Sequence, residues 1–124
     1  MPAQSIVFDP EGGPISVEIR CGHAQDGSYI LTLWGHNKVL QRFEGNFLDP
    51  HDDTHQFSGK ASSHAGQLVQ CRVEVAITPP ITLYAVIVTF WQDGMNCGSL
   101  TASGDAGTLN TVGINLFARL EPLE

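Results

Sequence analysis

The longest nearly unbroken apolar run of the chain, residues 81–94 with the sequence ITLYAVIVTFWQDG, limits the fold more than any other feature. β-Branched and aromatic residues follow one another from Val86 to Trp91, which favours a strand over a helix. Two prolines precede the run, and Asp93-Gly94 supplies a turn at its end. Because both faces of such a strand are apolar, we predict a central strand that is covered on both faces.

Two further stretches alternate strictly between apolar and polar residues, and each predicts a strand with one buried and one solvated face. They are residues 15–21 and 67–78. Other strands are expected at residues 4–8, 28–34, 38–43, 56–58, 96–103 and 112–120, with 28–45 forming a hairpin. Apart from the short edge strand, residues 45–66 are rich in Asp, His, Ser and Gly and predict a long loop. No helix is expected.

The Pro79-Pro80 break leaves no room for a crossover helix between the strands on either side of it. Those strands are therefore either hairpin partners or a pair that turns the corner between two sheets. Eight or nine strands, with 13 glycines and 7 prolines for turns, predict an all-β chain. We expect one antiparallel β-sandwich domain of Greek-key or jelly-roll type over residues 1–122, with a flattened β-barrel as the alternative. Residues 123–124 resemble a cloning scar.

Charge and cysteine content limit the partners and the compartment. A formal net charge of -7 with six Lys and Arg residues repels a phosphate backbone, so nucleic acid is not an expected partner. No apolar run is long enough for a transmembrane helix, and residues 1–13 do not resemble a signal peptide, so we expect a soluble protein. The three cysteines are odd in number and lack C-x-x-C spacing, which favours reduced thiols and a cytoplasmic location and leaves one disulfide open.

The densest polar cluster of the sequence is a candidate metal site. Histidine with adjacent carboxylates suits zinc, and carboxylates alone suit calcium, either as a structural ion or in a small metal-dependent hydrolase. The candidate ligands are Asp49, His51, Asp52, Asp53 and His55. A solvated acidic loop explains the same residues, because Pro50 and the lack of apolar periodicity argue against the helix that H-x-x-x-H spacing needs.

Two tryptophans at predicted strand ends form a second candidate site. Exposed aromatic rings stack against sugar rings, and nearby amides and carboxylates can bind hydroxyl groups. The candidate ligand-binding residues are Trp34, Asn37, Trp91, Asp93 and Asn96. Burial in the core is the ordinary alternative for either tryptophan.

No catalytic or cofactor motif is present, since the sequence has neither a G-x-S-x-G elbow nor a glycine-rich phosphate loop. We therefore expect a non-catalytic binding module that needs no cofactor and recognises a carbohydrate or a protein partner. The apolar edge at residues 4–8 is the candidate surface for a protein partner, including a second copy of the chain. The calcium- or zinc-binding module is the alternative.

Overall fold

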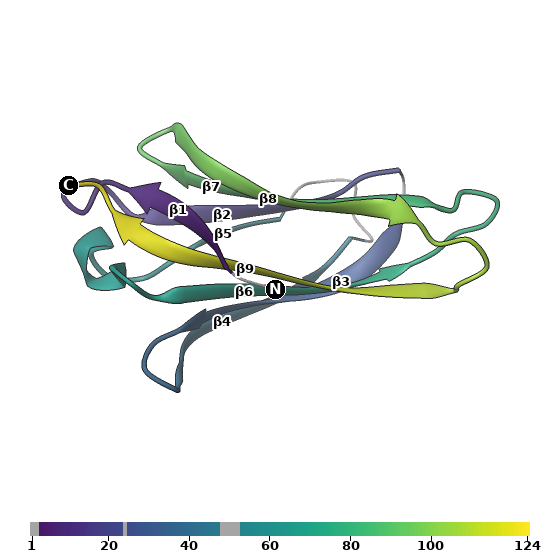
Figure 1. Cartoon of the computed structure of the whole chain (residues 1–124), viewed down its shortest axis with the longest axis horizontal. Helices are drawn as coiled ribbons and strands as arrows, with labels where there is room; N and C mark the ends of the chain where they lie inside the picture. The colour runs from purple at the N-terminus through teal and green to yellow at the C-terminus, as the bar shows by residue number, and fades with distance from the viewer. Residues whose placement is uncertain (1–2, 24, 48–52) are drawn as a thin grey trace.

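The computed structural model describes residues 3–23, 25–47 and 53–124. Within these ranges the chain forms two stacked β-sheets (Figure 1). The strands are β1 (Gln4–Phe8), β2 (Ile15–Cys21), β3 (Asp26–Trp34), β4 (Val39–Asn46), β5 (Asp53–Gln56), β6 (Leu68–Ala76), β7 (Leu83–Gln92), β8 (Met95–Asp105) and β9 (Thr111–Pro122). A short 3-10 helix, η1 (Ala61–His64), precedes β6.

One sheet has five strands in the order β1-β9-β6-β3-β4, and the other has four in the order β5-β2-β7-β8. This arrangement confirms the predicted all-β sandwich and excludes the closed barrel that we kept as an alternative. Neighbouring strands run antiparallel, with one exception: β1 pairs with β9 in parallel, with Ile6 beside Leu120. The expectation of a purely antiparallel sandwich is corrected at this edge.

The chain passes from one sheet to the other at every connection except the two hairpins, β3–β4 and β7–β8. The hairpin predicted at residues 28–45 is thereby confirmed. Strands β6 and β7 lie in different sheets, so the Pro79-Pro80 segment joins the two layers. Of the two arrangements left open for these strands, the corner between sheets is the correct one.

The core lies between the sheets and is formed by the inward residues of the alternating strands. On β2 these are Ile15, Val17 and Ile19, each at most 1% exposed. Strand β6 repeats the pattern with fully buried Val69 and Val73. Burial of each such side chain stabilises the fold by roughly 1.5–3 kcal/mol, which explains why the two clearest alternating patterns were correctly predicted as strands.

Strand β7 is covered on one face only, contrary to the prediction made for the apolar run. Its inward residues Val88 and Phe90 are fully buried, whereas the outward Leu83 and Ile87 are 48% and 37% exposed. The described part of the chain forms two layers, and a sheet in a two-layer sandwich has only one inner face. The outer face of the four-stranded sheet therefore carries an apolar stripe that the fold itself does not cover.

The expected loop at residues 45–66 contains two elements. Strand β5 pairs with β2, with Gln56 beside Ser16 and Thr54 beside Glu18. The polar composition hid this strand, because pairing with an open sheet edge can outweigh a weak intrinsic preference. It also lies slightly before the predicted 56–58 position, and the four-residue 3-10 helix η1 follows it. As predicted, the described residues form no α-helix.

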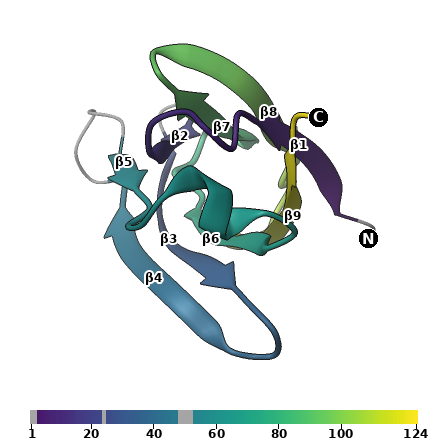
Figure 2. The same cartoon turned by 90° about the vertical axis from the view of Figure 1, so that its left-hand side faces the viewer.

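At both sides of the sandwich, residues at the edge of one sheet contact residues at the edge of the other (Figure 2). On one side, β1 lies between β9 and β8, and the Gln4 side-chain amide donates to the Ser99 carbonyl at 3.4 Å. On the other side, the amide of Gln41 on β4 bonds to both the N–H and the carbonyl of Ser58, at 2.9 and 3.0 Å. No helix of the described residues is long and apolar enough to cross a membrane.

Candidate functional site

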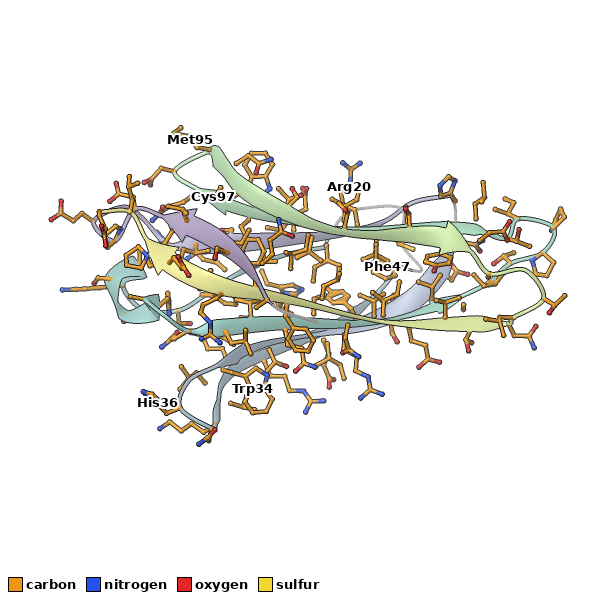
Figure 3. All side chains as sticks on the ribbon, viewed as in Figure 1. Arg20, Trp34, His36, Phe47, Met95 and Cys97 are labelled. Atoms are coloured by element: carbon orange, nitrogen blue, oxygen red, sulfur yellow. The ribbon has the colours of Figure 1, made fainter. Side chains whose placement is uncertain are left out.

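The two candidate tryptophans lie on opposite sheets. Leu33 is fully buried, so Trp34, the next residue of β3, faces outward from the five-stranded sheet. Trp91 follows the buried Phe90 and faces outward from the four-stranded sheet. Figure 3 shows Trp34 on the side of its sheet that points away from the other layer. Both indoles are half-buried, and neither is part of the core between the sheets.

Because the tryptophans face away from each other, the structure does not bring the five candidate residues into one site. Asp93 and Asn96 lie near Trp91 at the β7–β8 hairpin, and the side chains of both form hydrogen bonds with backbone groups of turns. The Asp93 carboxylate accepts the N–H of Gly13 at 3.1 and 3.2 Å, and the Asn96 Oδ1 accepts the N–H of Gly98 at 2.7 Å. These side chains hold the β1–β2 and β7–β8 turns in place.

Trp34 and Asn37, in contrast, line a common groove on the outer face of the five-stranded sheet. The groove has a volume of about 800 Å³ and lies between the β3–β4 turn and the segment that joins η1 to β6. Its lining residues are Trp34, Gly35, His36, Asn37, Lys38, Leu40, Ala65, Gly66, Gln67, Leu68, Gln70 and Arg119. We call this the Trp34 groove.

Hydrogen bonds across three strands fix the orientation of the indole. The Trp34 Nε1–H donates to Oε1 of Gln70 on β6 at 3.0 Å. The amide nitrogen of Gln70 in turn donates to Oδ1 of Asn115 on β9 at 3.2 Å. Because each partner stands on a paired strand of the same sheet, the ring is held by the scaffold rather than by a loop.

The β3–β4 turn forms one wall of the groove. The N–H of Gly35 donates to the carbonyl of Lys38 at 3.0 Å, and Asn37 adopts a positive φ of 55° at the tip. A Cβ at Gly35 would lie 2.9 Å from Leu40 Cδ1, so the glycine lets the Leu40 side chain pack closely across the turn. Leu40 remains 39% exposed and adds apolar surface to the groove.

The groove has a positive character that the chain as a whole lacks. Lys38 lines it from the β3–β4 turn, and Arg119 lines it from β9. The Arg119 guanidinium donates from Nη1 to the carbonyl of Gly66 at 2.8 Å, which places it at the groove wall. Among the described residues that line the groove there is no Asp or Glu.

Sequence reasoning found Trp34 and Asn37 but missed Gln70 and Arg119 as members of the site. Both occupy the polar phase of an alternating strand, so the pattern correctly predicts that they face solvent. Their proximity to Trp34 depends on strand order and register, which place Trp34, Leu68 and Arg119 in one row across β3, β6 and β9. Alternation within a strand carries no information about that register.

The candidate metal ligands are only partly described. Asp49, His51 and Asp52 lie outside the described residues, and Asp53 begins β5, where its backbone pairs with Ile19. Only His55 has a described side chain. Within the described ranges no three His, Cys, Asp or Glu residues come close enough to hold a metal ion.

His55 takes part in an aromatic cluster beside β4 and β5. Its Nε2 forms a short hydrogen bond with the Tyr29 hydroxyl, and its ring stacks on Phe43 with centroids 4.9 Å apart. Phe57 lies 6.1 Å from Phe43 by the same measure and is fully buried. The imidazole therefore helps to pack the side of the sandwich where the edges of the two sheets meet, and its Nε2 already has a partner.

All three cysteines are free thiols in the structure. Cys71 is buried between the sheets, and burial raises the pKa of its thiol to about 12. The pKa values of Cys21 and Cys97 are also raised, first by partial burial and then by the negative charges of Asp26 and Asp93 respectively. A raised thiol pKa disfavours the reactive thiolate, so these cysteines have a packing role rather than a nucleophilic one.

Comparison with known proteins gave no match among family models, curated proteins or solved structures.

Proposed function

We propose that this protein is a non-catalytic carbohydrate-binding module whose ligand lies in the Trp34 groove. The observation that carries the proposal is an indole held in a fixed orientation on an outer sheet face, inside an open groove lined by amide side chains. An indole face offers a platform for the C–H groups of a sugar ring, and amides both donate to and accept from hydroxyl groups.

The size of the groove supports this assignment. A volume of about 800 Å³ falls within the range of roughly 300–1,000 Å³ that is usual for small-ligand sites. An open groove along a sheet face can also accept the interior of an oligosaccharide, whereas an enclosed pocket accepts only an end.

The fixed orientation of the Trp34 ring also supports carbohydrate binding in the groove. Because Gln70 holds the Trp34 ring before any ligand arrives, little conformational freedom is lost when a sugar stacks on it. Trp91 has no described counterpart to this arrangement, because the polar groups beside it hold the neighbouring turns. The Trp34 groove is therefore the better of the two tryptophan sites.

The test is calorimetric titration of the protein with a panel of neutral and acidic oligosaccharides, repeated for Trp34→Ala and for Trp91→Ala. We expect Trp34→Ala to weaken binding of the best ligand at least tenfold, which corresponds to about 1.4 kcal/mol. Trp91→Ala is the matched control, and its affinity should stay within about twofold of the wild type. Thermal melting of both variants checks that each remains folded.

Two results would contradict the proposal. The first is that no oligosaccharide of the panel binds at millimolar concentration. The second is that folded Trp34→Ala binds as well as Trp91→Ala, which would place any ligand away from the Trp34 groove.

A second candidate function is self-association through the outer face of the four-stranded sheet. The observation in its favour is the apolar stripe at Leu83 and Ile87 on β7, which are 48% and 37% exposed. The outward positions of β7 carry no charge, and the neighbouring β2 places Arg20 opposite Ile87 and Glu18 opposite Thr89. Two copies that met there would therefore bring together an apolar stripe flanked by charges of both signs. The edge at residues 4–8 is a poorer candidate, because Ile6 and Phe8 belong to the core and Val7 is its one exposed apolar residue.

Sedimentation equilibrium over a hundredfold range of concentration tests the second candidate. We expect a mass that rises with concentration in the wild type and falls back to that of one chain in Ile87→Glu. A wild-type protein of constant single-chain mass up to about 1 mM would exclude it, since a weaker association is outside the usual range of specific dimers.

A further inference from the structure

The distribution of charge over the molecule is uneven, and the Trp34 groove stands out in it. The chain has 13 acidic and six basic residues. Four of the six basic residues belong to the outer face of the five-stranded sheet or to the turn that extends it, namely Lys38, Arg42, Arg72 and Arg119. In an acidic protein, such a concentration of positive charge beside an aromatic platform indicates a negatively charged ligand.

Glu44, Glu74 and Glu121 also point outward from this face, but none of the three lines the groove. Glu44 accepts a hydrogen bond from Arg42 at 2.6 Å, and Glu121 accepts one from the Ser5 hydroxyl at 3.2 Å. Lys38 and Arg119, in contrast, both line the groove. The positive charge of those two residues therefore acts on whatever occupies the groove.

Arg119 is oriented for binding an anion. Its guanidinium has five N–H donors in a planar fork, and the bond to Gly66 uses one of them. That bond also restricts the side chain, so less rotamer freedom is lost when a ligand binds. A guanidinium held in this way suits a carboxylate or a sulfate, because both offer paired oxygens to its fork.

The two cations stand at different ends of the platform. Trp34 and Arg119 lie in one row with a single strand between them, which separates their backbones by roughly 9–10 Å at the usual strand spacing. Lys38 lies beyond Trp34, in the turn that follows β3. A chain of sugar rings stacked on the indole would therefore meet one cation on each side.

We infer that the ligand of the Trp34 groove is an anionic glycan, with carboxylate or sulfate groups that contact Lys38 and Arg119. This inference rests on the proposed carbohydrate-binding function and specifies its ligand class. It assigns the stacking to Trp34, the hydroxyl contacts to the Asn37 amide at the tip of the β3–β4 turn, and the charge selectivity to the two cations.

The experiment compares ligands that differ only in charge. Oligogalacturonate is titrated against its fully methyl-esterified form, and sulfated dextran oligomers are titrated against plain dextran oligomers, all by calorimetry at 50 mM and 300 mM salt. We expect at least one charged form to bind ten times more tightly than its neutral partner at 50 mM salt. The preference should shrink at 300 mM salt, because exposed charges are screened. The pair that shows the preference distinguishes a carboxylate from a sulfate ligand.

Variants locate the selectivity. Lys38→Gln and Arg119→Gln should each weaken binding of the charged ligand several-fold and leave binding of its neutral partner unchanged. Lys60→Gln is the matched control, because Lys60 is exposed and lines a different surface depression near η1. Lys38 stands in an exposed turn, so its variant keeps the test valid even if Arg119→Gln is unstable.

The outcomes separate the two proposals. If charged and neutral forms bind equally and binding depends on Trp34, the anionic inference is wrong and the carbohydrate-binding function stands. If no glycan of either kind binds, both are wrong. A loss in Lys60→Gln as large as that in Lys38→Gln would also overturn the inference, because the effect would then reflect net charge alone.

Discussion

At the scale of single residues, Cys71 provides a sharp test of the core. Its side chain is fully buried, and burial raises the pKa of the thiol to about 12, so the thiolate is scarce at neutral pH. We predict that iodoacetamide at pH 7.5 modifies Cys71 only after unfolding in urea, while the partly exposed Cys97 reacts slowly in the folded protein. Mass spectrometry of digested samples, with and without urea, measures both rates. Equal labelling of Cys71 and Cys97 without urea would contradict this burial.

Sequence reasoning named Trp34 as a candidate because it ends a predicted strand next to a glycine turn, and the structure has it at that position. Its role in binding a ligand stays a prediction. Gln70 and Arg119 could not be assigned to the same site, since their contact with Trp34 arises from pairing between strands far apart in the chain. The sequence around Asp93 suggested a binding loop. In the structure, its carboxylate instead accepts a hydrogen bond from the N–H of Gly13, 80 residues away.

At the scale of elements, Gln92 joins the end of β7 to the β1–β2 connection. Its side-chain oxygen accepts the N–H of Asp9 at 2.8 Å, and its amide donates to the carbonyls of Asp9 and Gly13 at 2.7 and 2.9 Å. The residue is buried, so removal of the amide breaks three buried hydrogen bonds, although the Asp9 carbonyl keeps its bond from the Gly12 N–H. At about 1 kcal/mol for each hydrogen bond, we predict that Gln92→Ala lowers the free energy of unfolding by about 2–3 kcal/mol.

Urea unfolding measures that change. Gln4→Ala is the matched control, because Gln4 is exposed and makes a single long hydrogen bond to Ser99. Its effect should stay below about 0.5 kcal/mol. A Gln92→Ala variant as stable as Gln4→Ala would show that the contacts of Gln92 add nothing to the fold.

His55 on β5 allows the metal alternative to be tested within the same element. Because its Nε2 bonds to the Tyr29 hydroxyl and its ring stacks on Phe43, we predict that His55→Ala lowers the melting temperature through lost packing. The reduction should be the same with and without EDTA. If EDTA instead lowers the melting temperature of the wild type and leaves that of His55→Ala unchanged, a bound metal ion would explain the stability better than the aromatic cluster.

Element boundaries followed the hydrophobic pattern where that pattern was strong. Strands β2 and β6 were predicted from strict alternation, and their inward residues form the core. Strand β5 was largely missed, because its DTHQ sequence has no apolar period and its pairing with β2 is a tertiary effect. Strand β7 was assigned two covered faces because its sequence is apolar on both, and sequence alone does not state how many layers a fold has.

In the whole molecule, the two outer faces of the sandwich differ in a way that the linear sequence hides. The outer face of the five-stranded sheet gathers Trp34 and most of the positive charge, whereas the outer face of the four-stranded sheet carries the apolar stripe around Ile87. Strand count and turn composition were sufficient to predict the two-sheet architecture. The division of surface properties between the sheets depends on strand order, which is a property of the folded chain.

We predict that ligand binds beside Trp34 and away from Trp91, and a two-dimensional ¹⁵N–¹H spectrum of the two indole N–H groups distinguishes the two positions. The chain has only two tryptophans, so two indole signals report on the two sheet faces, and Trp91→Phe assigns them. During titration with the tightest-binding oligosaccharide, we predict that the Trp34 signal shifts progressively with ligand concentration and that the Trp91 signal stays in place. Movement of the Trp91 signal alone, or of neither signal at saturating ligand, would contradict ligand binding in the Trp34 groove.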